Sequence, residues 1–325
     1  MRNAATVKSV QSQRIDWSRF FADYAAWIVL GILLIINILV TPNFFHPNTL
    51  WNLISQSAGL IIISVGMTIV ISSGGIDLSA GSMMAIAAVS FTHMAYATNK
   101  ILWSIVFAFL VCGVIGLFNG YMISKWKVQP IILTLCMQMI LRGAALLSTA
   151  GNALFLDRFP IASTLGLYRF PGGLPGQIIP IVVVACIALF IFKVTRFGKN
   201  VEYVGDNSRA ARLTGISITG TLLAVYMSSA LLSCLGGLTE MFRTGACDPT
   251  TLGLTYETNA IAAVAIGGTS MKGGRARIIG SVIGAIIMTL INSTVNMNNI
   301  PFAYSNVVKT IIIVVAVSLQ RERKA

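Results

Sequence analysis

Charged residues are scarce in this sequence. Only 10% of its 325 residues are Asp, Glu, Lys or Arg, whereas an average soluble protein has about 25%. Hydrophobic residues make up 56% of the chain, and the mean hydropathy is +0.82. Because so few polar side chains cannot cover a water-exposed surface, we exclude an ordinary soluble domain. The composition predicts an integral membrane protein.

The usual signatures of catalysis are also missing. No G-x-x-x-x-G-K-[ST] phosphate-binding loop occurs, since Gly198-Lys199 lacks both the earlier glycine and the following Ser or Thr. The HExxH, GxSxG and kinase motifs are absent as well. We therefore predict that the chain is not an enzyme, that it does not hydrolyse ATP by itself, and that it needs no cofactor.

Metal-binding patterns are likewise lacking. His46 and His93 are isolated from each other and from other ligand types. The five cysteines show neither CxxC nor metal-ligand spacing. Acidic residues within the apolar runs are too few to form a relay of clustered carboxylates for protons. The sequence thus predicts no metal site.

The net charge of +13 does not indicate nucleic-acid binding. The basic residues lie between apolar runs and form no continuous stripe with aromatic residues, as a nucleic-acid surface would. We interpret them as determinants of membrane orientation.

Ten apolar runs are long enough, with their flanks, to be considered as membrane spans of about 20 residues. We treat the first run as a retained span, because the basic segment before it is long for a signal peptide and no small-residue cleavage site follows. The eighth run, 260–266, is too short to cross alone and would cross as a tilted or broken helix if it extended back to residue 251. The expected spans are 24–40, 56–72, 83–97, 101–123, 130–150, 178–192, 218–238, 251–266, 278–291 and 302–319.

Two glycine-rich segments, 74–82 and 260–268, predict broken or short helices. In both places an apolar helix precedes a Gly-Gly break and a small-residue helix follows it, although chance explains this similarity about as well as a repeat. Paired interrupted helices are typical of transporters built from structural repeats. The segment 151–177, rich in proline and glycine, is expected to be a loop.

Polar residues within the apolar runs are candidates for a translocation path. They are Asp77, Ser79, Asn119, Gln138 and Arg142. The last two are four residues apart and so share a helix face. An equally simple interpretation is that Asp77 and Ser79 cap the third helix, and that Arg142 is satisfied by neighbouring helices or extends to the membrane surface.

The polar segment 193–218 stands between two apolar runs and must lie at a membrane surface. Asp206 and Asn207 can cap a short helix over 208–213, and Gly215 can end it. Arg209 and Arg212 are three residues apart on one face of this helix. From the residues alone, a docking helix for a soluble partner and an ordinary solvated loop remain open alternatives.

The distribution of basic residues predicts both termini, and segment 193–218, on the cytoplasmic side. With ten spans and a cytoplasmic N-terminus, Arg142 and Lys309 lie within spans, and the other basic residues lie in inner segments with four exceptions. These exceptions are Lys100, Arg158, Arg169 and Arg243.

Three motifs, in this order and spacing, give the chain a specific resemblance to a known family. They are GGIDLSAGS at 74–82, the runs 196–205, 207–211 and 215–216, and AAVAIGG at 262–268 with Gly273-Gly274-Arg275. Along nearly its whole length the chain resembles the permease subunits of bacterial ABC importers for monosaccharides, the ribose, xylose, arabinose, galactose and galactofuranose group. It departs from the family pattern at Asp206, Ala80 and Ala276.

The resemblance implies one transmembrane permease domain over 1–325, in the bacterial inner (cytoplasmic) membrane, with 193–218 as its coupling loop. The implied partners are a second permease, identical or homologous, cytoplasmic ATP-binding cassette subunits, an extracytoplasmic sugar-binding protein and membrane lipid, and no nucleic acid. ATP hydrolysis would reside in the separate subunits. The ATPase-coupling residues that follow are Gly198, Gly205, Asn207, Arg209, Ala210, Ala211, Arg212 and Gly215.

Two other functions remain to be tested against this one. An ion-coupled secondary transporter of a small polar solute would need no ATPase. A scaffolding membrane subunit would transport nothing. The permease hypothesis predicts that Glu at positions 209 and 212 leaves the fold intact and uncouples transport.

Overall fold

The computed structural model describes residues 17–301 together with residues 304, 307, 310, 311 and 314. Within this part the chain is almost entirely helical, with one pair of two-residue strands. The elements are α1 (Trp17–Val40), α2 (Pro47–Ser72), α3 (Ala80–Thr98), α4 (Ile101–Lys125), α5 (Pro130–Thr149), β1 (Leu154–Phe155), α6 (Pro160–Leu167), α7 (Ile178–Val194), α8 (Arg196–Asp206), α9 (Ser208–Leu213), α10 (Ile218–Thr244), β2 (Ala246–Cys247), α11 (Tyr256–Ile266) and α12 (Ile278–Met297).

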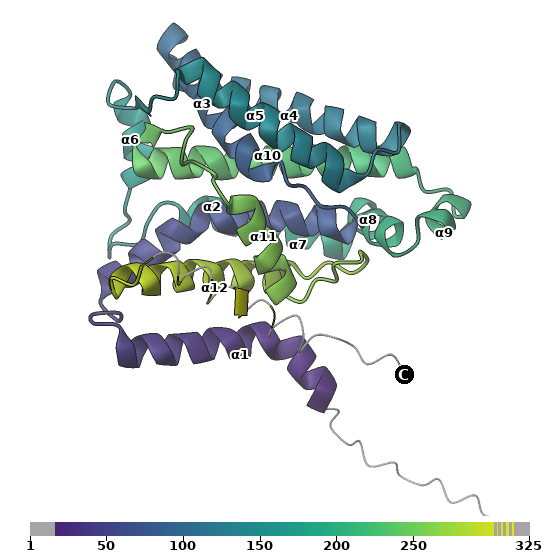
Figure 1. Cartoon of the computed structure of the whole chain (residues 1–325), viewed down its shortest axis with the longest axis horizontal. Helices are drawn as coiled ribbons and strands as arrows, with labels where there is room; N and C mark the ends of the chain where they lie inside the picture. Colours follow the sequence, from purple (N-terminus) through teal and green to yellow (C-terminus); the bar gives the residue numbers. More distant parts are fainter. Residues whose placement is uncertain (1–16, 302–303, 305–306, 308–309, 312–313, 315–325) are drawn as a thin grey trace, which may run out of the picture.

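The long helices lie side by side in layers, and α11 lies obliquely among them near the centre of the molecule (Figure 1). One end of the bundle carries α8 and α9, and the opposite end carries α6. We call these the α9 end and the α6 end. The strands β1 and β2 pair antiparallel, with Leu154 opposite Cys247 and Phe155 opposite Ala246.

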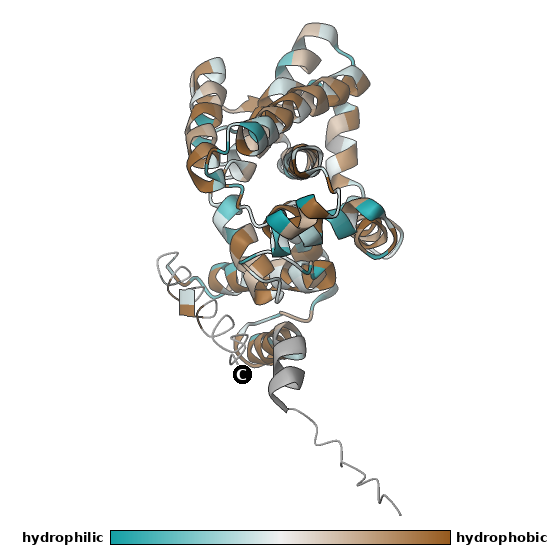
Figure 2. Ribbon diagram, turned by 90° about the vertical axis from the view of Figure 1, so that its right-hand side faces the viewer, coloured by the Kyte–Doolittle hydropathy of each residue, from teal (hydrophilic) through white to brown (hydrophobic). Residues whose placement is uncertain are grey.

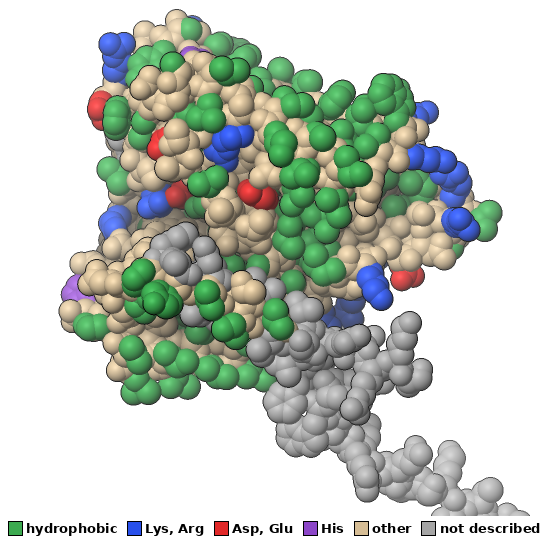
Figure 3. All heavy atoms as spheres, viewed as in Figure 1, with side chains coloured by type: hydrophobic (Ala, Val, Ile, Leu, Met, Phe, Trp, Pro, Cys, Tyr) green, Lys and Arg blue, Asp and Glu red, His purple; other side chains and the backbone are tan. Residues whose placement is uncertain are grey.

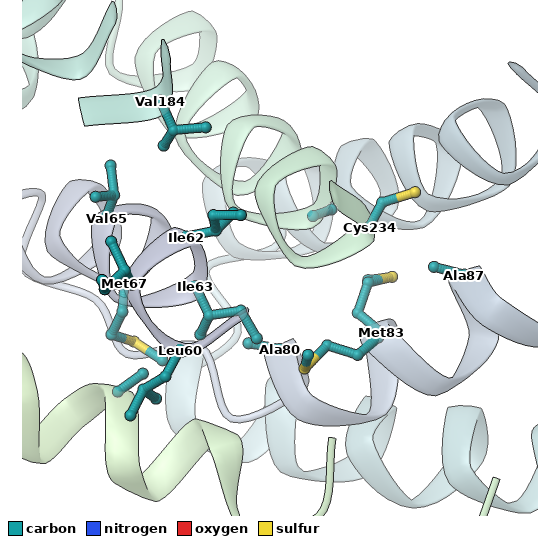
Figure 4. Close-up of a cluster of buried hydrophobic side chains, with 14 of the residues drawn as sticks. Leu60, Ile62, Ile63, Val65, Met67, Ala80, Met83, Ala87, Val184 and Cys234 are labelled. Atoms are coloured by element: carbon teal, nitrogen blue, oxygen red, sulfur yellow. The ribbon is translucent and has the colours of Figure 1, made fainter. Parts of the chain in front are cut away.

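Helix α2 forms the centre of the core. Every residue from 57 to 72 is buried, which is expected of a helix that is apolar on all sides. Side chains such as Ile62 and Ile63 of α2 face Met83 of α3 and Cys234 of α10 (Figure 4). The neighbours of α2 therefore surround it, and little of it could contact lipid.

Helices α4 and α10 approach closely because α4 presents glycine at the contact. A Cβ atom on Gly116 would lie 2.6 Å from the Cβ of Ala230, and one on Gly120 would lie 2.8 Å from the Cα of Leu223. Small residues four apart allow two backbones to meet, which replaces the hydrophobic driving force that is missing between helices in lipid.

Five helices are long and apolar enough to cross a membrane, namely α2, α4, α5, α10 and α12. Helices α7 and α8 would add a sixth span if they are taken together, although they are bent by 73° to each other. The described residues thus confirm an all-α, multi-pass membrane protein. Hydrophobic side chains cover the outer helices, whereas hydrophilic residues gather at the centre of the α9 end (Figures 2 and 3).

The expected helix ends were wrong in several places. Segment 151–177 contains α6 and β1, and α8 was not predicted at all. Helix α10 continues to Thr244, so Glu240 and Arg243 are helical, and α12 includes most of the expected turn over 292–299. Hydropathy marks where apolar residues stop, but a helix continues through polar residues wherever its backbone hydrogen bonds remain satisfied. Most of the tenth expected span, 302–319, lies outside the described residues, as do Arg2, Lys8, Arg14 and the basic residues near the C-terminus.

The first break occurs where it was expected. Helix α2 ends at Ser72 and α3 begins at Ala80, so the first break covers 73–79. Helix α11 has 11 residues, about 16 Å at 1.5 Å per residue. The short helix expected around 260–268 is α11 (Tyr256–Ile266), but the irregular segment beside it precedes the helix, at 248–255, and was not predicted as a break. We call this segment the second break.

Candidate functional site

Helix α9 has the local structure that its sequence predicts. The Oδ1 atom of Asn207 accepts hydrogen bonds from the backbone N–H groups of Arg209 and Ala210, both at 3.1 Å. At the other end, Gly215 adopts a φ of +85°, and its N–H donates to the carbonyl of Arg212 at 3.0 Å. Asn207 is therefore the N-cap. Asp206, the other expected cap, is instead the last residue of α8.

The surface of α9 is basic with an apolar tip. Ala211 is buried and anchors the helix, while Arg209, Ala210 and Arg212 are exposed. Leu213 is 90% exposed, although leucine is among the residue types most often buried. Lys and Arg side chains gather at this end of the molecule (Figure 3). The surface can therefore offer both charge and an apolar contact to a partner.

Two glycines hold α8 against the rest of the bundle. A Cβ on Gly198 would lie 2.5 Å from the carbonyl oxygen of Ile191, at the end of α7. A Cβ on Gly205 would lie 1.8 Å from the carbonyl oxygen of Ser72 and 2.9 Å from the backbone nitrogen of Gly274. No side chain fits at either position. The backbone of α8 is thus in direct contact with the end of α2 and with the loop 267–277.

The junction at Gly205 joins three segments that are far apart in the sequence. The N–H of Gly274 donates to the carbonyl of Ser72 at 3.0 Å. Glu202 of α8 accepts a hydrogen bond from the N–H of Ala276 at 3.1 Å and pairs with Lys199, also at 3.1 Å. A displacement of α8 would therefore be transmitted to the end of α2, next to the first break, and to the loop 267–277.

The first break is stabilised by a buried carboxylate. Asp77 is 2% exposed. Its Oδ1 accepts from the N–H of Ser79 at 3.0 Å and from the hydroxyl of Ser79 at 2.6 Å, and its Oδ2 accepts from the hydroxyl of Ser229 on α10 at 2.8 Å. Ser79 is the N-cap residue of α3 by position, but its side chain makes no capping hydrogen bond, and Asp77 bonds Ser79 itself and not an N–H group within the helix.

Asn119 of α4 also reaches this cluster, with its Nδ2 3.5 Å from the hydroxyl of Ser79. Its Oδ1 and the hydroxyl of Tyr226 are buried without a hydrogen-bond partner. Such orphaned polar atoms carry a free-energy penalty, and they call for a ligand, a water molecule or a second conformation. Three of the expected path residues, Asp77, Ser79 and Asn119, therefore meet in one buried cluster.

Gln138 and Arg142 form a second group on α5. Arg142 donates through Nη1 to the carbonyls of Pro249 and Leu252, both at 2.8 Å. Gln138 donates to Glu257 at the start of α11, at 2.9 Å. The guanidinium therefore satisfies carbonyls that the irregular second break leaves without helical partners. Irregular backbone at membrane depth requires such partners, so satisfaction of Arg142 by its neighbours is confirmed.

Sequence reasoning missed the residues that complete these two groups. Thr134 lies four residues before Gln138 on α5, and its hydroxyl accepts from the N–H of Leu78 at 3.1 Å. With Thr134, Gln138 and Arg142, one face of α5 contacts both breaks. Ser229 and Glu257 were also missed as partners, because residues so distant in sequence give no local signal of contact.

The arrangement places no cluster of metal-binding side chains among the described residues. It offers instead an exposed basic helix, a backbone junction behind it and two discontinuous segments within the bundle.

The sequence profile of the family described as "Branched-chain amino acid transport system / permease component" matches residues 49–317. The chain belongs to this permease family. The ribose import permease RbsC of Escherichia coli K12 is 33% identical over 323 residues, covering 98% of this chain and 100% of the relative. RbsC of Bacillus subtilis 168 is 34% identical over 97% of this chain and 98% of its own length.

A third relative is the galactofuranose transporter permease YtfT of Escherichia coli K12. It is 31% identical, over 91% of this chain and 89% of its own length. No solved structure matches the chain. The family membership agrees with the resemblance found in the sequence and with the helical membrane fold.

Proposed function

We propose that this chain is the membrane-spanning permease subunit of an ATP-driven importer, and that it translocates a monosaccharide. A binding protein outside the membrane would deliver the sugar, and cytoplasmic ATP-binding cassette subunits would supply the energy. The curated relatives are permeases for ribose, allose, galactofuranose and fructose import. They support a monosaccharide substrate but do not distinguish one sugar from another.

The observation that carries the proposal is the geometry of α9. The helix is capped at both ends, anchored by Ala211, and exposes Arg209, Arg212 and Leu213 next to the junction at Gly205. An ATPase that grips α9 could transmit its motion through α8 to α2 and to the loop 267–277. Segment 193–218 is the coupling loop in this proposal.

The topology that we propose has ten crossings, with both termini and the α9 end in the cytoplasm. Helix α7 has 17 residues, about 25 Å at 1.5 Å per residue, so it can cross a thin or locally compressed bilayer alone. Helix α11 crosses together with the second break. Lipid of the bacterial inner membrane and a second permease would cover the exposed apolar faces of α1, α4, α5 and α7.

The test uses the double variant Arg209→Glu and Arg212→Glu in the complete transporter. We expect normal amounts of folded permease, loss of ATPase co-purification and loss of sugar uptake. The two substitutions reverse the charge that α9 presents, so α9 would no longer complement the charge of the ATPase surface that binds it. The control is Lys125→Glu with Lys127→Glu, which makes the same charge change at the same end between α4 and α5. Equal loss from both pairs, or normal uptake in the α9 pair, would contradict the proposal.

An ion-coupled transporter would behave differently. Its purified permease alone would accumulate solute along a proton or sodium gradient, with no dependence on ATP. Under our proposal, reconstituted permease without ATPase subunits accumulates nothing under any ion gradient.

A further inference from the structure

A polar pocket of about 340 Å³ lies between α2, α10, α11 and α12. Its walls include Glu240 and Arg243 from the last turns of α10, Tyr256 and Asn259 from the first turn of α11, and Asn296 from the end of α12. These parts of α10 and α12 point toward the α6 end, away from α9. None of the residues that line the pocket belongs to the expected translocation path.

The charges in the pocket cancel. Glu240 is 9% exposed, and Arg243 donates to its Oε2 through Nε at 3.1 Å, as a pair three residues apart on α10. The remaining lining groups are neutral. An anionic ligand would face Glu240, and a cationic ligand would face an arginine that is already paired. The electrostatics therefore favour an uncharged ligand.

The hydrogen-bonding groups in the pocket suit hydroxyl groups. Gln56, Asn259 and Asn296 line it with carboxamides, each of which carries an acceptor oxygen and two N–H donors. Among the residues that the structure describes, none of these three side chains has a hydrogen-bond partner. Hydroxyls donate and accept in the same way, so a polyhydroxylated ligand could satisfy all three amides at once.

The pocket also has an apolar side and a suitable size. A Cβ on Gly59 of α2 would lie 3.5 Å from the ring of Tyr256 and 3.6 Å from Oε2 of Glu240, so the ring and the carboxylate adjoin the same part of α2. Leu60 completes this wall. The volume, about 340 Å³, is at the small end of the roughly 300–1,000 Å³ of known ligand sites and suits one sugar ring.

We infer that this pocket is an entry site that binds an uncharged monosaccharide before it crosses the permease. The inference rests on the proposed function. It adds to that function a location for sugar binding, which lies within one chain and at the α6 end. The site can be weak, because a separate binding protein supplies the affinity and a tightly held sugar would not move on.

Uptake by the complete transporter gives the first test. The variants Asn259→Leu and Asn296→Leu should each lower the maximal uptake rate roughly five- to tenfold, since each removes a hydrogen-bonding group and places an apolar one in the pocket. The matched control is Thr258→Val, since Thr258 precedes Asn259 on α11, is exposed and does not line the pocket. Uptake at the unaltered rate in both leucine variants would overturn the inference.

Alkylation of a cysteine at position 296 or 258 tests binding without transport. The background carries Cys136→Ser and Cys186→Ser, since these are the exposed cysteines, while Cys112, Cys234 and Cys247 are buried. Burial also raises the pKa of Cys247 to about 11, so its thiol stays protonated at neutral pH. We expect D-ribose, D-allose or D-fructose at tens of millimolar to slow maleimide reaction at Asn296→Cys and not at Thr258→Cys.

Protection at neither position by any of the three sugars would overturn the entry site, as would equal protection at both. Failure of the proposed function looks different. In that case the unaltered complex takes up no sugar and retains no ATPase subunit, whatever the alkylation result.

Discussion

The two breaks in the helix bundle are stabilised in different ways. In the first, Asp77 is almost wholly buried and bonds within its own turn and to α10. In the second, Thr250, Thr251 and Leu254 are exposed, and half-buried side chains of α5 hold the segment. From this difference we expect the first break to hold its conformation and the second to be displaced more easily when α5 moves.

The second break also touches the first turn of α3, directly after the first break. A Cβ on Gly81 would lie 2.4 Å from the carbonyl oxygen of Gly253, and one on Gly253 would lie 2.1 Å from the carbonyl oxygen of Gly81. Arg142 reaches Gly81 as well, at 3.5 Å. The backbones on the two sides are thus in direct contact. Four variants test how much the residues of each break contribute to stability and to sugar uptake.

The largest effect is expected for Gly253→Ala. This residue has a φ of +74°, which costs a side chain about 1–2 kcal/mol, and the clash with Gly81 adds about 1–3 kcal/mol. Gly245→Ala is the matched control, since Gly245 has a φ of +71° with nothing within 4 Å of a Cβ. Thermal unfolding in detergent should show a clearly larger loss for Gly253→Ala. Equal losses would mean that the second break and α3 are not in tight contact.

Next in size is Asp77→Ala. It leaves the N–H of Ser79 and the hydroxyl of Ser229 unsatisfied in a buried place, at a cost of about 2–3 kcal/mol. Asp77→Asn keeps an acceptor oxygen and should recover a large part of this loss. Thermal midpoints of the two variants give the comparison. If the alanine variant is as stable as the unaltered protein, the first break does not depend on this carboxylate.

A smaller loss of stability, about 2 kcal/mol, is expected for Arg142→Met, because the carbonyls of Pro249 and Leu252 lose a charged donor. Its effect on sugar uptake should exceed that of Asp77→Asn, since only the second break is expected to move. Arg142→Lys retains one donor group and should keep intermediate uptake. If sugar uptake falls only in proportion to stability across these variants, the two breaks do not differ in their role in transport.

The smallest effect is expected for Gln138→Leu. It removes one hydrogen bond to Glu257, worth about 1 kcal/mol. Met139→Leu, at an exposed position on the same helix, should change the thermal midpoint by much less. A loss as large as that of Arg142→Met would show that the bond from Gln138 to Glu257 stabilises the protein as much as the bonds of Arg142 to the second break do.

Local patterns in the sequence were sufficient to predict the helical membrane fold, the first break, the short helix α11 and the residues of α9. Asn207 caps α9 and Gly215 ends it because capping depends on neighbours only a few residues away. The same patterns placed the ends of α10 and α12 too early, since they follow hydropathy and not backbone hydrogen bonding. They also missed α8, which is polar and has no apolar run to mark it.

The sequence by itself determined that this chain crosses a membrane and that the chain breaks between α2 and α3, because burial in lipid requires apolar runs and glycine weakens a helix locally. Only the tertiary structure decided which segments meet. Gly205 touches Ser72, Gly81 touches Gly253, and Arg142 bonds Pro249 through contacts between residues far apart in the chain. No local rule encodes such pairs, because they arise when the whole bundle packs at once.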